Sequence, residues 1–480
     1  MSSDPRQAAG EVDPTDVVVV GGGVGGLIAA RACSLAGRRV ILVEASPALG
    51  GTVGSHVVDG LRLDSGAESF ATRRGTVAAY LAELGLADRI VQPNPEGAWV
   101  QLAERAIQLP RTGLLGIPAH PFDPTIATAI GRLGVARAKA DLLLPAAVGA
   151  KERTLGGLVR ARMGDRVVDR LVAPIVSGVH SAHPDEVDAD AVAPGLRAGP
   201  RRAGLARPRG RVDARRLARR IRRERHRRRR PPAGGRARRR PGAPRRGRPH
   251  PARRRVRAPP PLPRGRGRVR RLARRARRRP RHRRRRASSS RSPPPASSAS
   301  SPASRRASIT DGWPEPSSVE LVTLVVRAPE LDAAPRGTGV LVAADAPGIR
   351  AKALTHATAK WPWLKDLAGD RHVLRLSYGR AGGDDDTAGV PDDELTAIAV
   401  RDASALLGVD LAGRVTGSAR VRWTNALPFA ASGHRERVQA VRDEAAEHPG
   451  LEITGSAVAG TGLASVVADA RAAADRVLGR

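Results

Sequence analysis

The stretch DVVVVGGGVGGLIAARACSLAGRRVILVE, residues 16–44, decides the fold of this chain. Four valines precede a glycine-rich turn, an Ala- and Leu-rich segment follows it, and RVILVE at 39–44 is a second apolar run. Valine-rich runs are typical of strands covered on both faces, and parallel strands need a crossover connection between them. The stretch therefore predicts a strand, a helix over 27–36 that Gly37 ends, and a second, parallel strand.

The glycine turn is typical of dinucleotide binding. Gly21, Gly23 and Gly26 form the pattern GxGxxG directly after the first predicted strand. The first glycine permits the tight turn, the second lets the backbone approach a pyrophosphate, and the third lets helix and strand pack closely. The helix N-terminus then faces the phosphates, and Glu44, 18 residues after Gly26, can accept hydrogen bonds from ribose hydroxyls. The alternative is a chance glycine-rich turn.

Two later stretches favour FAD among the dinucleotides. A second glycine pair, Gly50 and Gly51, follows the ribose acid, and a backbone without side chains there suits a cofactor lying extended along the domain. DSGAESF at 64–70 is another small-residue loop. The alternatives are a plain turn between strands for the first and a solvated loop for the second.

The net charge of +38 belongs to one block. Residues 201–300 hold 43 arginines against two acidic residues, Asp213 and Glu224, a net charge of +41. The other 380 residues hold 41 basic and 44 acidic groups, a net charge of −3. The charge therefore does not indicate a polyanion-binding protein as a whole.

The block at 199–306 has three interpretations. Arg, Pro, Ala, Gly and Ser are the residues that GC-rich codons give out of frame, so a frame-shifted translation is the first. A disordered basic insertion that binds nucleic acid is the second, although no aromatic residue interleaves with its arginines. A divergent folded segment is the third. Since so few apolar residues are present, disorder is the physical expectation, and translation of the other two frames would separate the hypotheses.

Other features exclude several classes. The single cysteine, Cys33, excludes a disulfide framework and a cysteine-based metal site, and we expect no metal. No apolar run is long enough to span a bilayer, and residues 1–14 are polar and acidic, unlike a secretory signal. A cytoplasmic location is therefore expected.

The remaining pattern predicts alternating elements. Residues 125–172 have the period of helices, and SSVELVTLVV at 317–326 has the pattern of a strand. Further helices are expected at 76–84, 397–407, 435–447 and 464–478, short strands within 96–122, and a last strand at 453–455.

These residues carry a family resemblance. The chain resembles the FAD-dependent porphyrinogen oxidases among the amine-oxidase-like flavoproteins, and more narrowly the bacterial branch that oxidises coproporphyrinogen III. Beside the glycine turn, the resemblance rests on VEASPALGG (43–51), DSGAESFATRRG (64–75), LPRTGLLGIPA (109–119), LGGLVRARMGDRVVDRLVAPIVSGVHSAHPDEVDADA (155–191), AKWPWL (359–364), VRWTNALPFAASGHRERV (421–438) and PGLEITGSAVAGTGL (449–463). The stretches cover about 16–198 and 317–480.

The resemblance implies an α/β fold, α+β overall. A Rossmann-like FAD-binding domain is discontinuous, and a mixed-sheet substrate domain and a helical subdomain accompany it. The implied boundaries are 15–92 for the first part of the FAD domain, 93–198 for a helical and substrate-binding region, 199–306 for the anomalous segment, 307–430 for a substrate-binding region and 431–480 for the C-terminal part of the FAD domain.

The resemblance also assigns residues to FAD. The pyrophosphate turn is Gly21, Gly22, Gly23, Val24, Gly25 and Gly26, the acid at the ribose is Glu44 with its neighbour Ala45, and the second glycine turn contributes Gly51. The loop that lines the flavin is Gly66, Ala67, Glu68 and Ser69. Trp423 lies beside the cofactor, and Gly460 and Gly462 belong to the closing loop. The family usually has Lys or Arg where this chain has Thr52, and a branched residue and Pro where it has Leu463 and Ala464.

The implied activity is six-electron oxidation of coproporphyrinogen III to coproporphyrin III, with oxygen as acceptor and hydrogen peroxide as product. Protoporphyrinogen IX is the alternative substrate, and an inactive frame-shifted product or a basic nucleic-acid-associated protein is the alternative of another class.

No catalytic side chain is assigned, and Lys360 and Arg422 are candidates for binding the substrate's propionates. The expected partners are the porphyrinogen and molecular oxygen, without nucleic acid, with at most peripheral membrane contact, and with a homodimer as an option. Because 199–306 lacks the family's strand-rich segment, we expect poor retention of FAD.

Overall fold

A β-α-β unit begins the described chain, as the sequence predicts. Strand β1 (Val17–Val20), helix α1 (Val24–Leu35) and strand β2 (Val40–Val43) follow one another, and the strands pair in parallel with Val17 opposite Val40. Gly37 follows the helix with φ +83°, a left-handed conformation that glycine adopts at little cost. The predicted helix end at Gly37 is confirmed.

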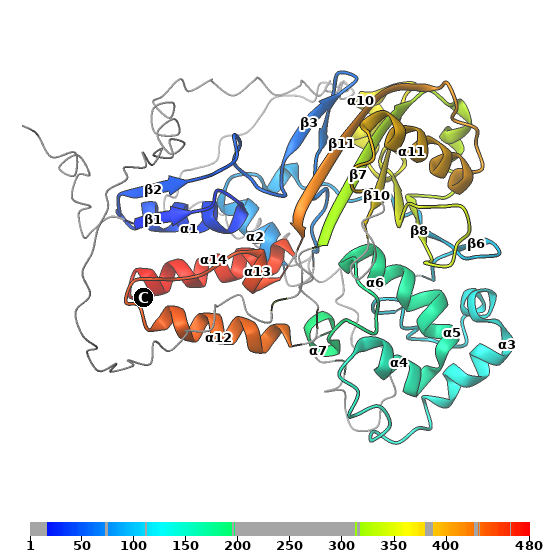
Figure 1. The fold of residues 1–480 in the computed structure, drawn as a ribbon, viewed down its shortest axis with the longest axis horizontal. Coiled ribbons are helices and arrows are strands. Elements are labelled where there is room, and N and C mark those ends of the chain that lie inside the picture. The colour runs from blue at the N-terminus through cyan, green and yellow to red at the C-terminus, as the bar shows by residue number, and fades with distance from the viewer. Residues whose placement is uncertain are drawn as a thin grey trace, which may run out of the picture. The chain divides into compact units, whose positions relative to one another are not determined.

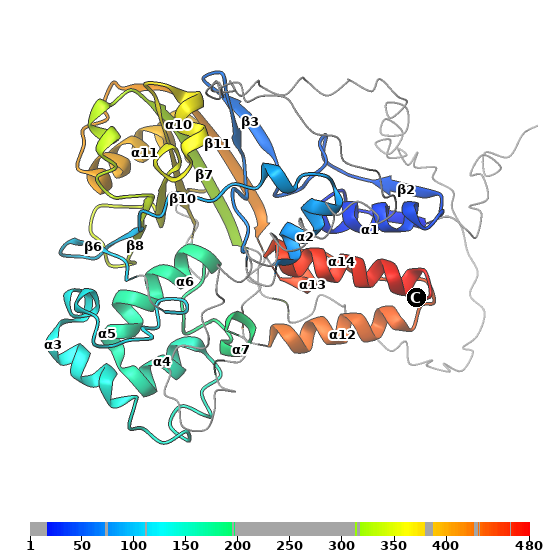
Figure 2. The same ribbon diagram turned by 180° about the vertical axis from the view of Figure 1, so that it is seen from behind.

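The structure is a computed structural model, shown from two sides in Figures 1 and 2. It describes residues 17–72, 75–110, 113–193, 196, 313, 317–379, 387–426, 431, 433–460 and 462–480. These residues belong to one compact unit. The interpretations of 199–306, disorder included, lie outside the described residues.

Helices cover one face of the β1–β2 sheet. Helix α14 (Leu463–Val477) lies alongside α1 (Figure 1), and their Cys33 and Ala474 pack with Val17 and Val40. The opposite face is apolar and open to solvent, since the Val18 and Val20 side chains are 51% and 83% exposed. Among the described residues, β2 is the only strand paired with β1. In the part of the chain that the structure describes, the sheet therefore has one face open to solvent, and β1 lies at its edge.

The last strand predicted at 453–455 is wrong. Residues 451–454 have no strand assignment, and Gly455 precedes the short helix α13 (Ser456–Ala459). A strand exists only where a neighbour accepts and donates its backbone hydrogen bonds. Here β1 faces this segment across a cavity and is not paired with it.

A second, mixed sheet contains seven strands. Its order is β11-β7-β10-β9-β8-β5-β6, and the pairing is antiparallel except between β5 and β8. The strands are β5 (Trp99–Gln101), β6 (Ala106–Gln108), β7 (Ser317–Val326), β8 (Gly339–Val342), β9 (Ala353–His356), β10 (His372–Tyr378) and β11 (Val415–Ala426). The predicted strand at 317–326 is confirmed.

The two faces of this sheet have separate cores. Alternate residues of a strand point to opposite faces, so Leu324 packs on helix α11 (Asp392–Leu407) while Val325 packs on the other side. That side is covered by the hairpin β3 (Ser55–Val58) and β4 (Leu61–Asp64) and by the short helices α9 (Ala357–Lys360) and α10 (Pro362–Ala368).

A helical region has its own core. It contains α3 (Pro124–Ala140), α4 (Leu155–Met163), α5 (Asp165–Val167), α6 (Ala173–His180) and α7 (Ala189–Val192), with a π-helical turn at Val168–Val172. The side chains of Asp123 and Thr154 cap the first turns of α3 and α4. The other helices are α2 (Thr76–Glu83) and α12 (His434–Ala446), with 3-10 turns at Ala87–Arg89 and Pro329–Ala333. The predicted class, α/β elements with a mixed sheet and a helical subdomain, is confirmed.

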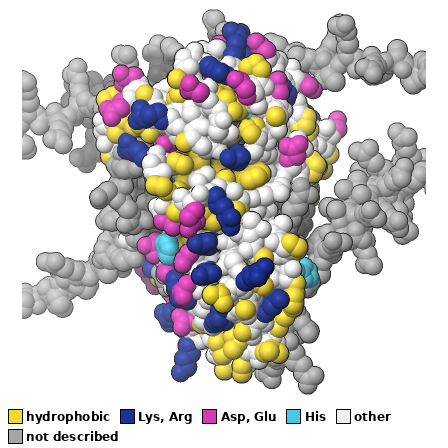
Figure 3. Space-filling model, turned by 90° about the vertical axis from the view of Figure 1, so that its right-hand side faces the viewer, with side chains coloured by type: hydrophobic (Ala, Val, Ile, Leu, Met, Phe, Trp, Pro, Cys, Tyr) yellow, Lys and Arg dark blue, Asp and Glu magenta, His cyan; other side chains and the backbone are white. Residues whose placement is uncertain are grey.

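Charges of both signs mix on the described surface. On the face in Figure 3, Lys and Arg (dark blue) and Asp and Glu (magenta) are interspersed. This agrees with the near-neutral charge of the chain outside the arginine block. No helix of the described residues is long and apolar enough to cross a membrane.

A buried histidine pair between β9 and β10 predicts acid sensitivity. His356 is 1% exposed, and its Nε2 lies 3.1 Å from Nδ1 of His372. Burial, followed by the charges of His372 and Lys365, lowers the pKa of His356 to about 3, and Asp332 opposes the shift. In the unfolded chain this histidine takes up a proton near pH 6.5, whereas in the folded chain it does so only near pH 3. Because the unfolded state binds the proton more readily, the free energy of unfolding falls as pH falls through this window.

We expect His356→Asn to flatten the decline of the denaturation midpoint between pH 7 and pH 4, measured by circular dichroism. The exposed His448→Asn is the control and should leave the slope unchanged. An identical slope in His356→Asn and the wild type would contradict the assignment.

Candidate cofactor site

The glycine turn between β1 and α1 has the shape that a pyrophosphate needs. Gly21 has φ +101°. A Cβ on Gly26 would collide with the carbonyl oxygen of Gly21, whereas one on Gly23 would meet no atom of the described residues within 4 Å. Gly23 is also the N-cap of α1, and that end has no side-chain cap from the residues that the structure describes. The turn is therefore closed where helix and strand pack and open where the helix N-terminus points.

The second glycine pair runs past the first. The Gly50 N–H donates to the Gly22 carbonyl at 2.8 Å, and Gly23 and Gly50 form an isolated parallel bridge. A Cβ on Gly51 would lie 3.2 Å from the Gly23 Cα. The structure thus brings the two turns into direct contact.

Glu44 sits at the end of β2 beside these turns. Its carboxylate accepts hydrogen bonds from the backbone N–H groups of Ser46 at 2.7 Å and Gly22 at 2.5 Å. These bonds lower its pKa to about 2, with Ser46 the largest cause and the Ala45 backbone a smaller one. The carboxylate is therefore ionised at neutral pH and remains an acceptor.

The loop at 64–70 joins the second turn. The Ala67 N–H donates to the Thr52 carbonyl at 2.9 Å, and Trp423 Nε1 of β11 donates to the Ser65 carbonyl at 3.1 Å. A Cβ on Gly66 would collide with the Thr52 carbonyl and would lie 3.1 Å from the Trp423 ring. Thus Thr52, Gly66 and Trp423 meet, while Ala67 and Ser69 are exposed.

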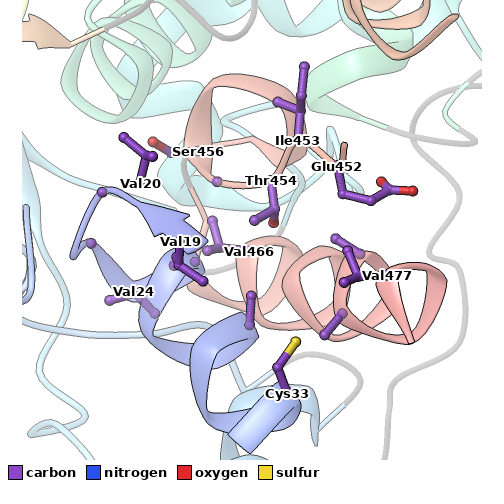
Figure 4. Close-up of a pocket in the computed structure, with 18 of the residues that line it drawn as sticks. Val19, Val20, Val24, Cys33, Glu452, Ile453, Thr454, Ser456, Val466 and Val477 are labelled. Carbon is purple, nitrogen blue, oxygen red and sulfur yellow. The ribbon is translucent and has the colours of Figure 1, made fainter. Parts of the chain in front are cut away.

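A cavity of about 790 Å³ lies between β1 and the C-terminal segment. Figure 4 shows Val19 and Val24 on one side and Ile453 and Thr454 on the other. Its lining includes all of β1, both glycine turns, Thr52, and the residues at 450–457. Several predicted residues do not line it: Gly22, Glu44, Ala45, Gly66, Ala67, Glu68, Ser69, Trp423, Gly460 and Gly462.

The C-terminal contribution differs from the prediction. Gly460 ends α13 with φ +100° and Gly462 is the N-cap of α14, whereas Thr461 between them lies outside the described residues. The closest approach to the glycine turn comes instead from Gly455, whose Cα would lie 3.0 Å from a Cβ on Gly25. The sequence places Gly455 at the end of the predicted strand 453–455 and assigns it no role in the site.

The two candidates for substrate carboxylates are held in ion pairs. Lys360 Nζ binds the Glu68 carboxylate, and Arg422 Nη1 lies 2.5 Å from Oε1 of the buried Glu320. Neither contact was apparent from the sequence, because the partners are distant along the chain.

Comparison with known proteins identifies the family. The coproporphyrinogen III oxidase of Mycobacterium tuberculosis (strain H37Rv) is 30% identical over 97% of this chain and 98% of its own length. The chain belongs to the coproporphyrinogen III oxidase family. A relative of the same name from Mycobacterium leprae is 28% identical over 94% of this chain and 96% of its own length. The family model "Flavin containing amine oxidoreductase" matches residues 24–227.

The fold agrees with this family. A crystal structure from Exiguobacterium sp. 255-15 matches with a TM-score of 0.67 and 21% identity, over 98% of this chain and 100% of that one. This coproporphyrinogen III oxidase family member is thus a flavin-dependent oxidoreductase with FAD as cofactor. The open space at Gly23, the uncapped helix and the ionised Glu44 fit the pyrophosphate and ribose of that cofactor.

Proposed function

We propose that this chain oxidises coproporphyrinogen III to coproporphyrin III. The reaction removes six electrons and six protons, and three molecules of oxygen are reduced to three of hydrogen peroxide. The observation that carries the proposal is the open pyrophosphate turn at Gly23, set in a chain that resembles coproporphyrinogen III oxidases over nearly its whole length.

The chain's own residues bind and orient the cofactor in this proposal. The backbone of Gly21, Gly22, Gly23, Val24, Gly25 and Gly26 and the N-terminus of α1 would hold the pyrophosphate, and Glu44 with Ala45 would hold the ribose. Gly51, Gly66, Ala67, Glu68 and Ser69 would line the flavin end, where Trp423 holds the Ser65 carbonyl. Bound FAD would supply the acceptor for hydride from the substrate.

The domain boundaries given in the sequence analysis also stand as a proposal. The change of composition, with 43 arginines in residues 201–300, supports a separate middle segment. Homodimerisation, peripheral membrane contact and a cytoplasmic location stay predictions.

Substrate oxidation in air tests the proposal. The purified chain, with FAD added to offset weak retention, is given coproporphyrinogen III or protoporphyrinogen IX, and porphyrin fluorescence and peroxide are followed. We expect kcat/KM to be higher for coproporphyrinogen III, and one peroxide to form per two electrons removed. A preference for protoporphyrinogen IX would favour the alternative substrate, which a relative named "Protoporphyrinogen oxidase 1, chloroplastic" from Spinacia oleracea, 27% identical over 36% of this chain, supports. Failure to oxidise either substrate with FAD bound would overturn the proposal.

A further inference from the structure

An ion cluster holds the loop at 64–70 against the seven-stranded sheet. Lys360 at the end of α9 donates to Oε1 of Glu68, and Nη2 of Arg375 on β10 lies 3.1 Å from its Oε2. The second arm of the same guanidinium, Nη1, donates to the Gly66 carbonyl at 2.7 Å. The Glu68 side chain is only 10% exposed. Hydrogen bonds to charged groups in such a setting are stronger than neutral ones.

The loop is held from its other side as well. The Thr52 carbonyl accepts from Ala67, and the Trp423 indole donates to Ser65. The loop backbone is therefore fixed between the second glycine turn and three elements of the sheet region: α9, β10 and β11. Glu68 is the side chain on which two of these contacts converge.

The charges of the cluster balance. Glu68 and Asp64 are the carboxylates, and Lys360 and Arg375 are the cations. Burial, and then the negative charge of Glu68, raises the pKa of Asp64. Burial, and then the charge of Arg375, lowers the pKa of the nearby His56, which leaves it neutral. The side chains of Glu68, Lys360 and Arg375 are 10%, 22% and 15% exposed, so removing the charge of Glu68 or of Lys360 leaves a charge of the opposite sign without its partner in a mostly buried place.

We propose that Glu68 is a positioning residue, which through Lys360 and Arg375 fixes the 64–70 loop and keeps the electrostatic charge at the flavin end of the cofactor site balanced. This rests on the proposed placement of FAD. Glu68, Lys360 and Arg375, which come from distant parts of the chain, thus share one positioning role. Neither Lys360 nor Arg375 is then a free cation for substrate carboxylates.

Hydrogen exchange of the FAD-free chain tests the fixing of the loop. We expect Glu68→Gln to raise the amide exchange rate of residues 65–70 about tenfold or more, because the variant removes the negative charge that binds Lys360 and Arg375. Glu330→Gln is the matched control: Glu330, in the 3-10 turn at Pro329–Ala333, forms an exposed ion pair with Arg414 at 2.7 Å. It should leave exchange of the loop unchanged.

The midpoint potential of bound flavin tests the charge balance. Glu68→Gln and Lys360→Met break the same ion pair but leave opposite net charges. Positive charge near the flavin favours its electron-rich reduced form, so the potential should rise in the first variant and fall in the second. A purely structural role would move both in the same direction. Lys360→Arg, which keeps the positive charge, should have the midpoint potential of the wild type.

The outcomes are separable from those of the proposed function. Unchanged loop exchange in Glu68→Gln overturns the positioning role, whatever the chain oxidises. Potentials that shift in the same direction overturn the charge balance. A wild-type chain that binds FAD and shows the exchange effect, yet oxidises no porphyrinogen, keeps the positioning role and removes the proposed reaction.

Discussion

Gly26→Ala and Gly23→Ala should both abolish tight FAD binding, for different reasons. The added methyl of Gly26→Ala collides with the Gly21 carbonyl, so the turn itself must open and the chain loses stability, by about 1–3 kcal/mol. The methyl of Gly23→Ala enters open space at a residue with φ −68°, so the fold should lose about 1 kcal/mol or less. That methyl occupies the space assigned to the pyrophosphate.

Titration with FAD, followed by quenching of flavin fluorescence, measures both effects. We expect Kd to rise about 100-fold or more in each variant, equivalent to about 2.7 kcal/mol. The denaturation midpoint should fall clearly in Gly26→Ala only. Gly348→Ala, in a remote turn with φ +73° and open space around its Cβ, should bind FAD as the wild type does. Tight FAD binding by Gly23→Ala would contradict the placement of the pyrophosphate.

Asp141→Ala should be the most destabilising single change in the helical region. Asp141 is completely buried and accepts from Arg162 Nε at 2.5 Å. The Arg162 guanidinium also donates to the Pro145 and Val148 carbonyls, each at 3.1 Å, so it cannot turn to solvent without losing these bonds. Removing the carboxylate leaves a buried charge without its counterion, at a cost of about 3–5 kcal/mol.

Two further variants separate this effect from ordinary loss of charge. Asp165→Ala removes an exposed carboxylate from its 2.8 Å contact with Arg160, and should cost about 1 kcal/mol or less. The double variant Asp141→Leu with Arg162→Met removes both charges and should recover most of the loss. Protease susceptibility of residues 124–180 and the denaturation midpoint are the measurements. Equal effects of Asp141→Ala and Asp165→Ala would contradict the assignment.

The cofactor turn was predictable because its information is local. Residues 16–44 contain the valines of β1, the glycines of the turn and the acid at the end of β2 within one continuous stretch. Glycine is required where a carbonyl leaves no space for a Cβ, as at Gly26, and such requirements are visible as a pattern of residue types. The strand at 317–326 was predictable for the same reason, since its apolar run is continuous.

The prediction of a strand at 453–455 was wrong because a strand also depends on a partner from elsewhere in the chain. Its sequence, Ile453-Thr454-Gly455, contains two residue types that strands favour, but β1 lies across a cavity from this segment and forms no ladder with it. Hydrogen bonds from a second strand decide whether such a segment is a strand. The family resemblance had indicated that the segment before 307 should supply strands to this region, and 199–306 shows no strand pattern.

By itself, the sequence determined the β-α-β unit, the dinucleotide motif and the family, because each depends on residues close together or on a pattern along the chain. Only the tertiary structure decided that Glu68 meets Lys360 and Arg375, 292 and 307 residues away, and that β2 is the one strand of the described residues that pairs with β1. Ion pairs and strand pairing depend on which distant segments meet, and packing of the whole chain settles that.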